Sequence, residues 1–478
     1  MKYLLLTLAV FSAVFFRCFA SDKKDDPRKL SIYQIMVASF RHSPEGANGY
    51  NALWGPDDNT KNGNLKGITE AIPHIKSLGV NAIWLTPVFD STSASGGEKL
   101  QATGYFTNNY FRIDPNFGTE EDFIELVNTA HENGLYVFLD GVFGHHGGVT
   151  EPSPKGNTLD VTVTTCDRKD GGTGNIKYPG SLEYIKEVAT HYIEKYGIDG
   201  WRLDQAYQAM QGGHNYWKEI RKAVEDAAAA RKKKGEKWGT LGYMVGEDWG
   251  DARRINDGVY KNGGLLSAFD FEGKELISGP MQEIEGEGLV NGWKDVEKIL
   301  SDPKARGYLN NKVMPNLFLS NHDGYRVADH FDVTDPCFYE KLMTRNAILA
   351  AYSGPITLYY GDEYADQSKM LHGGQKDNIA RTSGHLEART PGEQRLKDYI
   401  SYIMGMRAAN PAMWRGKASF EYPEINNADV LVVYKKDPES RNKVAVVFSD
   451  ADTEVSLKGV ESPVKVSAYV PQIIRIEE

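Results

Sequence analysis

The chain has 478 residues, enough for one large domain together with smaller ones at about 150 residues per domain. Hydrophobic residues make up 41% of the chain, which allows a large core and argues against global disorder. The formal net charge of −10 argues against nucleic acid as a partner.

The first twenty residues have the pattern of a signal peptide. Lys2 precedes an apolar run over residues 3–16, and small residues before Ser21 offer a cleavage site. Because the run is too short to span a membrane comfortably, we expect no stable membrane anchor and a secreted or periplasmic protein. Cys166 and Cys337 would remain after cleavage, and an oxidising compartment permits a disulfide between them, although their spacing does not show one.

Taken in chain order, apolar stretches typical of buried strands alternate with stretches of helical periodicity. The predicted strands cover residues 31–40, 82–88, 135–143, 198–204, 243–247, 265–271, 313–320 and 356–360. The predicted helices cover residues 69–78, 120–133, 181–196, 215–234, 293–300, 338–352 and 392–408, with Thr119 as an N-cap. Eight strands alternating with helices predict an α/β fold, a closed (β/α)8 TIM barrel over residues 28–410.

Two segments do not fit the repeating unit. Residues 146–180 are rich in Gly, Pro, Thr and Asp, and we interpret them as a short inserted domain after the third strand. Residues 415–478 contain strand patterns at 430–434, 444–448, 464–469 and 473–476, which predict a C-terminal all-β domain, a small β-sandwich.

Charged side chains gather at the predicted carboxyl ends of the strands, where barrel enzymes place their catalytic groups. Arg202 and Asp204 lie two residues apart, on one face of a strand. The guanidinium would keep Asp204 ionised, so the pair is either a structural ion pair or part of a catalytic site. Glu247 and Asp323 end two other strands. Carboxylates from three strands suit retaining glycoside hydrolysis, which needs an ionised nucleophile and a protonated acid about 5–5.5 Å apart.

The remaining roles follow from neighbouring residues. Trp249 beside Glu247 would hold that carboxyl protonated by desolvation. Asp323 could hold sugar hydroxyls and stabilise developing positive charge. Tyr105, Trp249 and Tyr207 are possible stacking faces for sugar rings, although ordinary packing explains Tyr207 equally well.

With these residues in view, the chain resembles glycoside hydrolase family 13, the α-amylase family, over nearly all of its length after residue 32. Four stretches are similar to the family's motifs in the family's order: residues 140–145, 200–204, 246–249 and 318–323. Gly104-Tyr105 and residues 354–363 are similar to two further family signatures. The resemblance implies Asp204 as nucleophile, Glu247 as acid/base and Asp323 as transition-state stabiliser. The residues expected to bind substrate are Tyr105, Asp140, His145, Arg202, Trp249 and His322.

Several positions depart from the family pattern. The resemblance implies a structural calcium, but Gly144 replaces the asparagine that commonly binds it, so no metal ligand is assigned. Tyr207 and Gln208 stand where many α-amylases have a Lys-His pair that contacts the sugar beyond the cut. Tyr178-Pro179-Gly180 is the nearest equivalent of a further motif, and Asn109-Tyr110 replaces a common Asp-Tyr pair.

The sequence favours an α-amylase-like hydrolase that cuts α-1,4 bonds of starch-type glucans or maltooligosaccharides, acting as a monomer. Alternatives within the family are a cyclomaltodextrinase or neopullulanase-like enzyme, an α-glucosidase and a glucanotransferase. Cyclomaltodextrinases usually carry an extra N-terminal β domain, which the expected mature chain lacks. A glycan-binding protein without activity is the alternative from another class, but all three carboxylates are present.

Overall fold

The computed structural model describes residues 26–51, 62–94, 97–147, 151–161, 174–284, 286–368 and 379–477. The predicted signal peptide and Cys166 lie outside these residues. Cys337 is a free thiol among the described residues.

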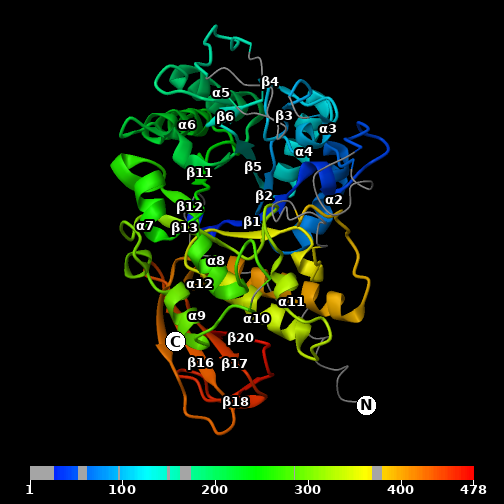
Figure 1. The fold of residues 1–478 in the computed structure, drawn as a ribbon. Helices are drawn as coiled ribbons and strands as arrows, with labels where there is room; N and C mark the ends of the chain where they lie inside the picture. Colours follow the sequence, from blue (N-terminus) through cyan, green and yellow to red (C-terminus); the bar gives the residue numbers. More distant parts are fainter. Residues whose placement is uncertain are drawn as a thin grey trace.

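Eight parallel strands form a closed barrel in the order β1-β14-β13-β12-β11-β8-β5-β2 (Figure 1). The strands are β1 (Ser31–Ile35), β2 (Ala82–Leu85), β5 (Tyr136–Gly141), β8 (Gly200–Leu203), β11 (Tyr243–Gly246), β12 (Ser267–Phe269), β13 (Met314–Phe318) and β14 (Ile356–Tyr359). This confirms the barrel predicted from the alternation of strands and helices. Each predicted strand contains one of these eight.

The helices surround the barrel. They are α1 (Val37–Phe40), α2 (Leu65–Ser77), α3 (Glu98–Gln101), α4 (Glu120–Glu132), α5 (Leu182–Tyr196), α6 (Trp217–Lys233), α7 (Ala252–Ile255), α8 (Phe271–Ser278), α9 (Trp293–Leu300), α10 (Phe338–Ala351), α11 (Pro391–Ala409) and α12 (Pro411–Arg415). Thr119 caps α4 in a capping box with Asp122, as the sequence pattern predicted.

Several predicted boundaries were wrong, and at three of them a polar side chain bonds to a backbone N–H group and so changes where the element begins or ends. The first strand ends at Ile35, and α1 follows it, because the N–H of Val37 bonds to the hydroxyl of Thr86 rather than to a neighbouring strand. Helix α2 starts four residues earlier than predicted, since the side chain of Asn64 caps it. Strand β12 stops at Phe269, because Asp270 accepts the N–H of Gly273 and starts α8.

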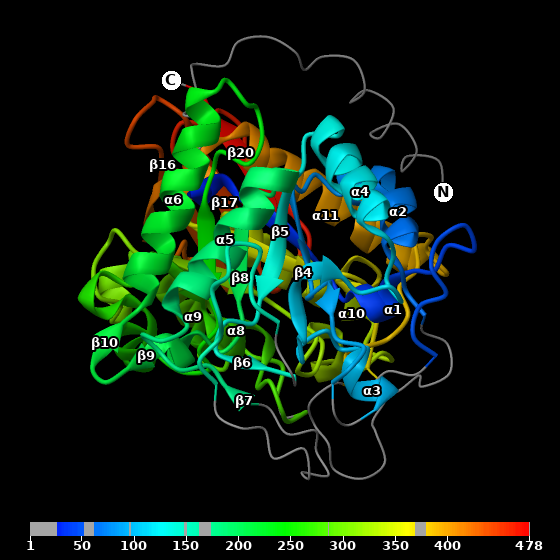
Figure 2. The ribbon, with the colours of Figure 1, turned by 90° about the horizontal axis from the view of Figure 1, so that it is seen from above.

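Short elements extend from the carboxyl ends of the barrel strands. Strands β3 (Phe89–Asp90) and β4 (Asn109–Ile113) pair after β2, and β6 (His145–His146) and β7 (Gly174–Asn175) pair after β5. In the view from above, β6 and β7 lie together at one edge of the molecule (Figure 2). The segment predicted as an inserted domain, residues 146–180, therefore leaves the barrel along β6 and returns along β7, which pairs with it in a small antiparallel ribbon.

The C-terminal region is all β and lies below the barrel in Figure 1. Strands β15 (Lys417–Glu421), β16 (Val430–Lys436), β17 (Lys443–Ser449) and β20 (Gln472–Ile476) form one sheet, and β18 (Thr453–Val455) pairs with β19 (Val464–Val466). Valines of both sheets share a separate apolar cluster. The region is fixed to the barrel helices, where Trp293 packs 5.7 Å from Phe448 and buried Lys435 donates to the carbonyl groups of Ala351 and Met413.

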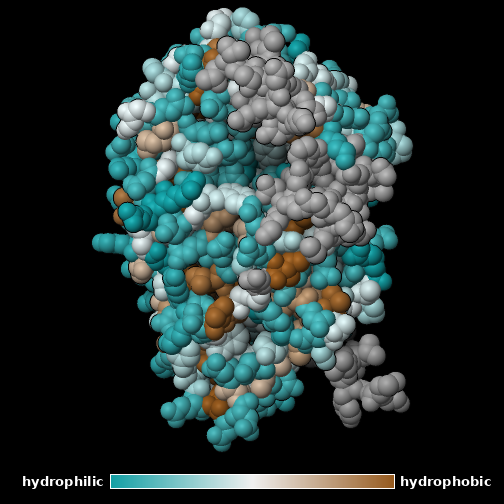
Figure 3. All heavy atoms as spheres, viewed as in Figure 1, coloured by the Kyte–Doolittle hydropathy of each residue, from teal (hydrophilic) through white to brown (hydrophobic). Residues whose placement is uncertain are grey.

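Figure 3 shows one face of the outer surface. The face in Figure 3 is mostly hydrophilic, and its hydrophobic residues form only small scattered groups. Across the described residues, none of the helices is long and apolar enough to cross a membrane.

Candidate active site

Five charged residues meet at the carboxyl ends of β5, β8, β11 and β13. Asp140 lies near the end of β5, Arg202 lies in β8, Asp204 follows β8, Glu247 follows β11 and Asp323 follows β13. The register pairs Asp140 with Arg202 across β5 and β8, so both side chains enter the same layer of the barrel. All but Asp323 are buried.

The guanidinium of Arg202 holds the cluster together. Its Nη1 donates to Oδ1 of Asp140 and to Oδ1 of Asp204, both at 2.9 Å, and its Nη2 lies 2.9 Å from Oε1 of Glu247. The contact with Asp204 is the one expected from the alternation of side chains. The sequence did not show that the same cation also serves two other carboxyl groups.

One guanidinium cannot neutralise three buried carboxylates, and this governs their protonation. Burial raises the pKa of Asp140 to about 6, although Arg202 opposes the shift. Burial and the nearby charge of Glu247 also raise the pKa of Asp204, again against Arg202. A raised pKa is typical of a buried carboxyl group at a catalytic site.

The role predicted for Trp249 needs a correction. The sequence suggested that its ring shields Glu247 from water. In the structure its indole N–H donates to Oε1 of Glu247 at 2.8 Å, and the backbone N–H of Gln205 donates to Oε2 at 3.1 Å. The indole therefore contacts Glu247 through its polar N–H and does not cover the carboxyl group with its apolar face. The orientation of an indole is decided by tertiary packing, which a sequence does not contain.

An aromatic and polar layer lies opposite these groups. The ring of Tyr105 stacks on His322 at 5.3 Å with an angle of 5° between the planes, and its hydroxyl donates to Asp140 at 2.7 Å. Burial, followed by the charges of Arg381 and Arg202, lowers the pKa of His322 well below its usual value. The ring is therefore neutral. Its Nδ1 accepts from the side-chain amide of Gln34 at 2.7 Å, which leaves the proton on Nε2, 3.2 Å from Asp323.

His145 and its neighbours occupy the base of the β6 ribbon. Its Nε2 donates to the carbonyl of Tyr105 at 3.1 Å, and its Nδ1 lies 3.2 Å from Oε1 of Gln208. That Gln208 side chain lies over Gly144, where an added Cβ would be only 1.9 Å from Oε1. The space that the side chain of the family's calcium-binding asparagine would need is thus filled by the side chain of Gln208. A search of the described residues finds no cluster of three or more His, Cys, Asp and Glu residues suited to a metal.

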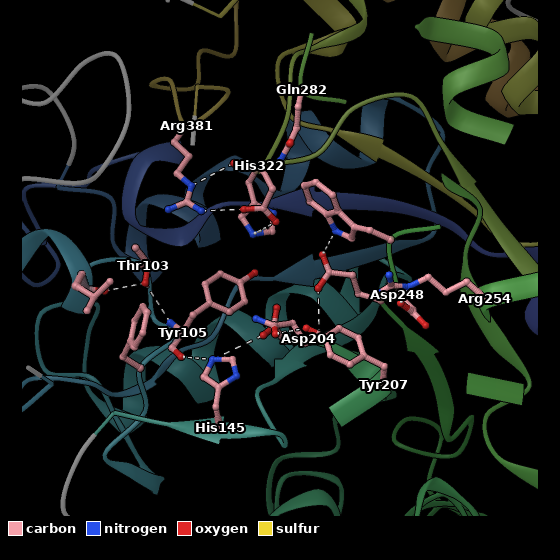
Figure 4. Close-up of a pocket in the computed structure, with 16 residues that line it drawn as sticks. Thr103, Tyr105, His145, Asp204, Tyr207, Asp248, Arg254, Gln282, His322 and Arg381 are labelled. Carbon is pink, nitrogen blue, oxygen red and sulfur yellow. Dashed lines mark hydrogen bonds and ion pairs between the residues drawn. The ribbon is translucent and has the colours of Figure 1, made fainter. Parts of the chain in front are cut away.

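The residues surround a cavity of about 480 Å³ (Figure 4). Of the predicted site residues, seven line it: Tyr105, His145, Asp204, Glu247, Trp249, His322 and Asp323. Asp140 and Arg202 do not line it. Asp140 is fully buried, with both oxygens bonded to Arg202 and one also to Tyr105, so it positions other side chains and does not reach the cavity.

Several cavity residues were missed by the sequence analysis. Arg381 donates to Oδ1 of Asp323 at 2.8 Å, and Gln282 lines the cavity from the loop after α8. Arg254 pairs with Asp248 at 2.6 Å beside Glu247. None of them belongs to a local motif that could have revealed it. Arg381 reaches the site from 58 residues beyond Asp323, and only the closed barrel brings the two together.

Comparisons with known proteins agree with this site. The family model for the catalytic domain of α-amylase matches residues 34–157 and 175–421. A cyclomaltodextrinase from a Bacillus species is 26% identical over 447 residues, covering 86% of this chain and 71% of its own. The intracellular maltogenic amylase of Bacillus subtilis is 30% identical over 361 residues, covering 69% of this chain and 54% of its own. The solved structure of AmyP in complex with maltose is 32% identical, with a TM-score of 0.77, and the match covers 94% of this chain and 97% of that one.

The closed barrel, the matching family model and these relatives define a glycoside hydrolase. The chain belongs to the α-amylase family, glycoside hydrolase family 13.

Proposed function

We propose that this enzyme cleaves α-1,4-glucosidic bonds of starch-type glucans or maltooligosaccharides with retention of configuration. Asp204 is the nucleophile, Glu247 the acid/base, and Asp323 stabilises the transition state. The observation that carries the proposal is the convergence of these three carboxyl groups, from three strands, on one cavity. AmyP, whose structure was solved with maltose, supports a glucan substrate.

In the proposed first step, Asp204 attacks the anomeric carbon while Glu247 protonates the departing glycosidic oxygen. Arg202 contacts both carboxyl groups and so holds them at a fixed spacing. In the second step a water oxygen attacks the anomeric carbon and breaks its bond to Asp204, while Glu247 takes the proton from that water. This mechanism requires the proton to lie on Glu247 when the glycosidic bond breaks.

The layer of Tyr105 and His322 suits the sugar ring under attack. The tyrosine ring supplies a stacking face, and the neutral imidazole and Asp323 supply a donor and an acceptor for hydroxyl groups. Arg381 pairs with Asp323 at 2.8 Å and so positions the carboxyl group that would stabilise positive charge on the ring.

The roles of the two central carboxyl groups can be separated with α-maltosyl fluoride, whose leaving group needs no proton. We expect Glu247→Gln to lose starch hydrolysis but still form a glycosyl-enzyme with the fluoride, detected by mass spectrometry of the intact protein. Asp204→Asn should form none. Near-native starch hydrolysis by a folded Glu247→Gln variant would disprove the assignment.

A cyclomaltodextrinase-like activity is the second candidate, favoured by the similarity to the Bacillus cyclomaltodextrinase over 86% of this chain. A time course with maltoheptaose, soluble starch and β-cyclodextrin separates the two. Mixed oligosaccharides of middle length from starch, with little ring opening, support an endo-acting amylase. Fast ring opening supports the cyclomaltodextrinase, products longer than maltoheptaose support a transferase, and glucose alone from the start supports an α-glucosidase.

Export is also part of the proposal, because residues 1–20 have the charge and apolar pattern of a signal peptide. Expression of the whole chain in a bacterial host should yield exported protein whose sequence begins at Ser21. An intact N-terminus on cytoplasmic protein would contradict it.

A further inference from the structure

A second, much smaller cavity lies inside the barrel beside Arg202. It has a volume of about 10 Å³, and its polar wall includes Gln34, Arg202, Glu247 and Asn321. Most of the other residues that line it are aromatic. A space of this size holds about one water molecule.

Two buried polar atoms belong to this wall and lack a protein partner. Nε of Arg202 is a donor and Oε1 of Gln34 is an acceptor, and neither forms a hydrogen bond with any residue that the structure describes. Both side chains are fully buried, so an unsatisfied donor or acceptor is costly here. A water molecule in the cavity can accept from Nε and donate to Oε1, which satisfies both atoms. A further anion is disfavoured, because Arg202 already contacts three carboxyl groups.

The other end of the Gln34 amide contacts a residue of the active site. Gln34 lies in β1 and pairs in register with Trp84 of β2, with both side chains lining the small cavity. Its Nε2 donates to Nδ1 of His322 at 2.7 Å. This bond keeps the ring proton on the opposite nitrogen, Nε2, which lies 3.2 Å from Asp323.

The surroundings of His322 leave its ring with a single proton to place. Burial is the largest cause of its lowered pKa, and the positive charges of Arg381 and Arg202 add to it, against the opposing charge of Glu247. Asp323 faces Nε2, and Tyr105 stacks on the ring. In a neutral imidazole the hydrogen bond at one nitrogen decides whether the other can donate. Without a donor at Nδ1, a bare Nε2 could face the carboxylate.

We propose that Gln34 is a positioning residue, which links Arg202 to Asp323 through one buried water molecule and His322. The inference rests on the proposed function and deepens it. The amide oxygen holds the water that satisfies Nε of the guanidinium, and the amide nitrogen fixes the ring that donates to Asp323. Arg202 in turn contacts the proposed nucleophile and the proposed acid/base. Gln34 does not line the large cavity, yet it fixes side chains that hold all three carboxyl groups.

The first test is Gln34→Glu, which keeps the shape of the side chain and adds a removable proton. At pH 5 the new carboxyl group, whose pKa burial raises, and Nδ1 of His322 share one proton. Whichever atom holds it, Nε2 keeps its own proton and still donates to Asp323. At pH 8 the shared proton is lost, the carboxylate draws the remaining ring proton to Nδ1, and a bare Nε2 faces Asp323. We expect kcat/KM for maltoheptaose, relative to wild type at the same pH, to be about tenfold higher at pH 5 than at pH 8.

Two further variants separate this effect from a general disturbance of the core. Gln34→Met has a similar shape but no group that can carry the proton, so its activity relative to wild type should be lowered equally at both pH values. Asn346→Asp makes the same change from amide to carboxyl at a buried position on α10, where the described hydrogen bond of the side chain goes to the carbonyl of Leu342. Its relative activity should also be the same at pH 5 and pH 8. Urea unfolding at both pH values shows that each variant is folded.

Two spectroscopic and structural readouts report the proton and the water directly. In protein labelled with ¹⁵N-histidine, the ring resonances of His322 are identified by their absence from His322→Gln. They should show a proton on Nε2 in the wild type and on Nδ1 in Gln34→Glu at pH 8. A crystal structure of the wild type should show a water molecule within hydrogen-bonding distance of Arg202 Nε and Gln34 Oε1.

Equal relative activity of folded Gln34→Glu at the two pH values overturns the proposal, as does recovery of Gln34→Met at pH 5. A ring proton on Nδ1 of His322 in the wild type also overturns it. A wild-type crystal structure without a water molecule in the small cavity overturns the link to Arg202. Wild-type protein that does not cleave maltoheptaose at any pH refutes the proposed function itself, and this result appears before any substitution is made.

Discussion

Replacing Arg202 by methionine should destabilise the protein strongly and in a pH-dependent manner. The guanidinium is buried and contacts Asp140, Asp204 and Glu247. Removing one partner of a buried ion pair costs about 3–5 kcal/mol. Methionine fills part of the space, but no other cation contacts all three carboxyl groups among the described residues.

The pH dependence follows from the carboxyl groups that remain. The pKa of Asp140 in the folded protein is already about 6, above the value of about 3.9 in an unfolded chain. Loss of Arg202 removes the main opposing charge, so the pKa values of Asp140 and Asp204 rise further. An acid with a raised folded pKa binds more protons in the folded state, so stability falls as the pH rises through that pKa. At pH values above the folded pKa, each further unit by which that pKa rises lowers the free energy of unfolding by about 1.4 kcal/mol.

Urea unfolding at pH 5 and pH 8 measures this effect. We expect the free energy of unfolding of Arg202→Met to be about 3–5 kcal/mol below wild type at pH 8, with a clearly smaller difference at pH 5. Arg345→Met is a matched control, because the described hydrogen bonds of this buried guanidinium go to the carbonyl groups of Ile277 and Glu287 and not to a carboxylate. Its loss of stability should change little between the two pH values. If Arg202→Met lost the same free energy of unfolding at pH 5 and at pH 8, the reasoning would be refuted.

Three further outcomes are expected. Gly144→Ala should cost about 1–3 kcal/mol and lower activity, because the new Cβ displaces Gln208 from His145; unchanged urea unfolding would contradict this. Burial alone would raise the pKa of Asp270. The charge of Arg306 and the hydrogen bonds from Arg306 and other donors outweigh this effect, so the pKa lies below its usual value. Arg306→Met should therefore lose about 3–5 kcal/mol at neutral pH and less below about pH 4, where the carboxylate is protonated; a deficit that persists at low pH would argue against the ion pair. Metal chelation should leave the melting temperature unchanged, since Gln208 fills the place beside Gly144, and a lower melting temperature would reveal a bound metal.

Local patterns in the sequence were sufficient to predict the barrel. Each barrel strand is a short apolar run, and α4 shows its N-cap and its periodicity in the sequence itself. Arg202 and Asp204 face the same way because they are two residues apart in one strand. The seven predicted residues that line the cavity were found for the same reason: each lies in a contiguous motif close to the end of a strand or in the loop after it.

Interactions between distant segments had no such signal. The contacts of Arg381 with Asp323, of Arg254 with Asp248 and Tyr207, and of Gln208 with Gly144 depend on side-chain positions that only the folded chain defines. The hydrogen bond from Trp249 to Glu247 was not predicted either, because adjacency in sequence does not say which edge of an indole faces a carboxylate.

The sequence by itself predicted the fold and the family and placed three carboxyl groups at the ends of strands, because strand alternation and contiguous motifs are properties of neighbouring residues. The tertiary structure decided how one guanidinium is shared among three carboxyl groups and which residues lie behind the cavity wall. These features depend on distances of a few ångströms between residues far apart in the chain, and such distances are fixed only when the barrel closes.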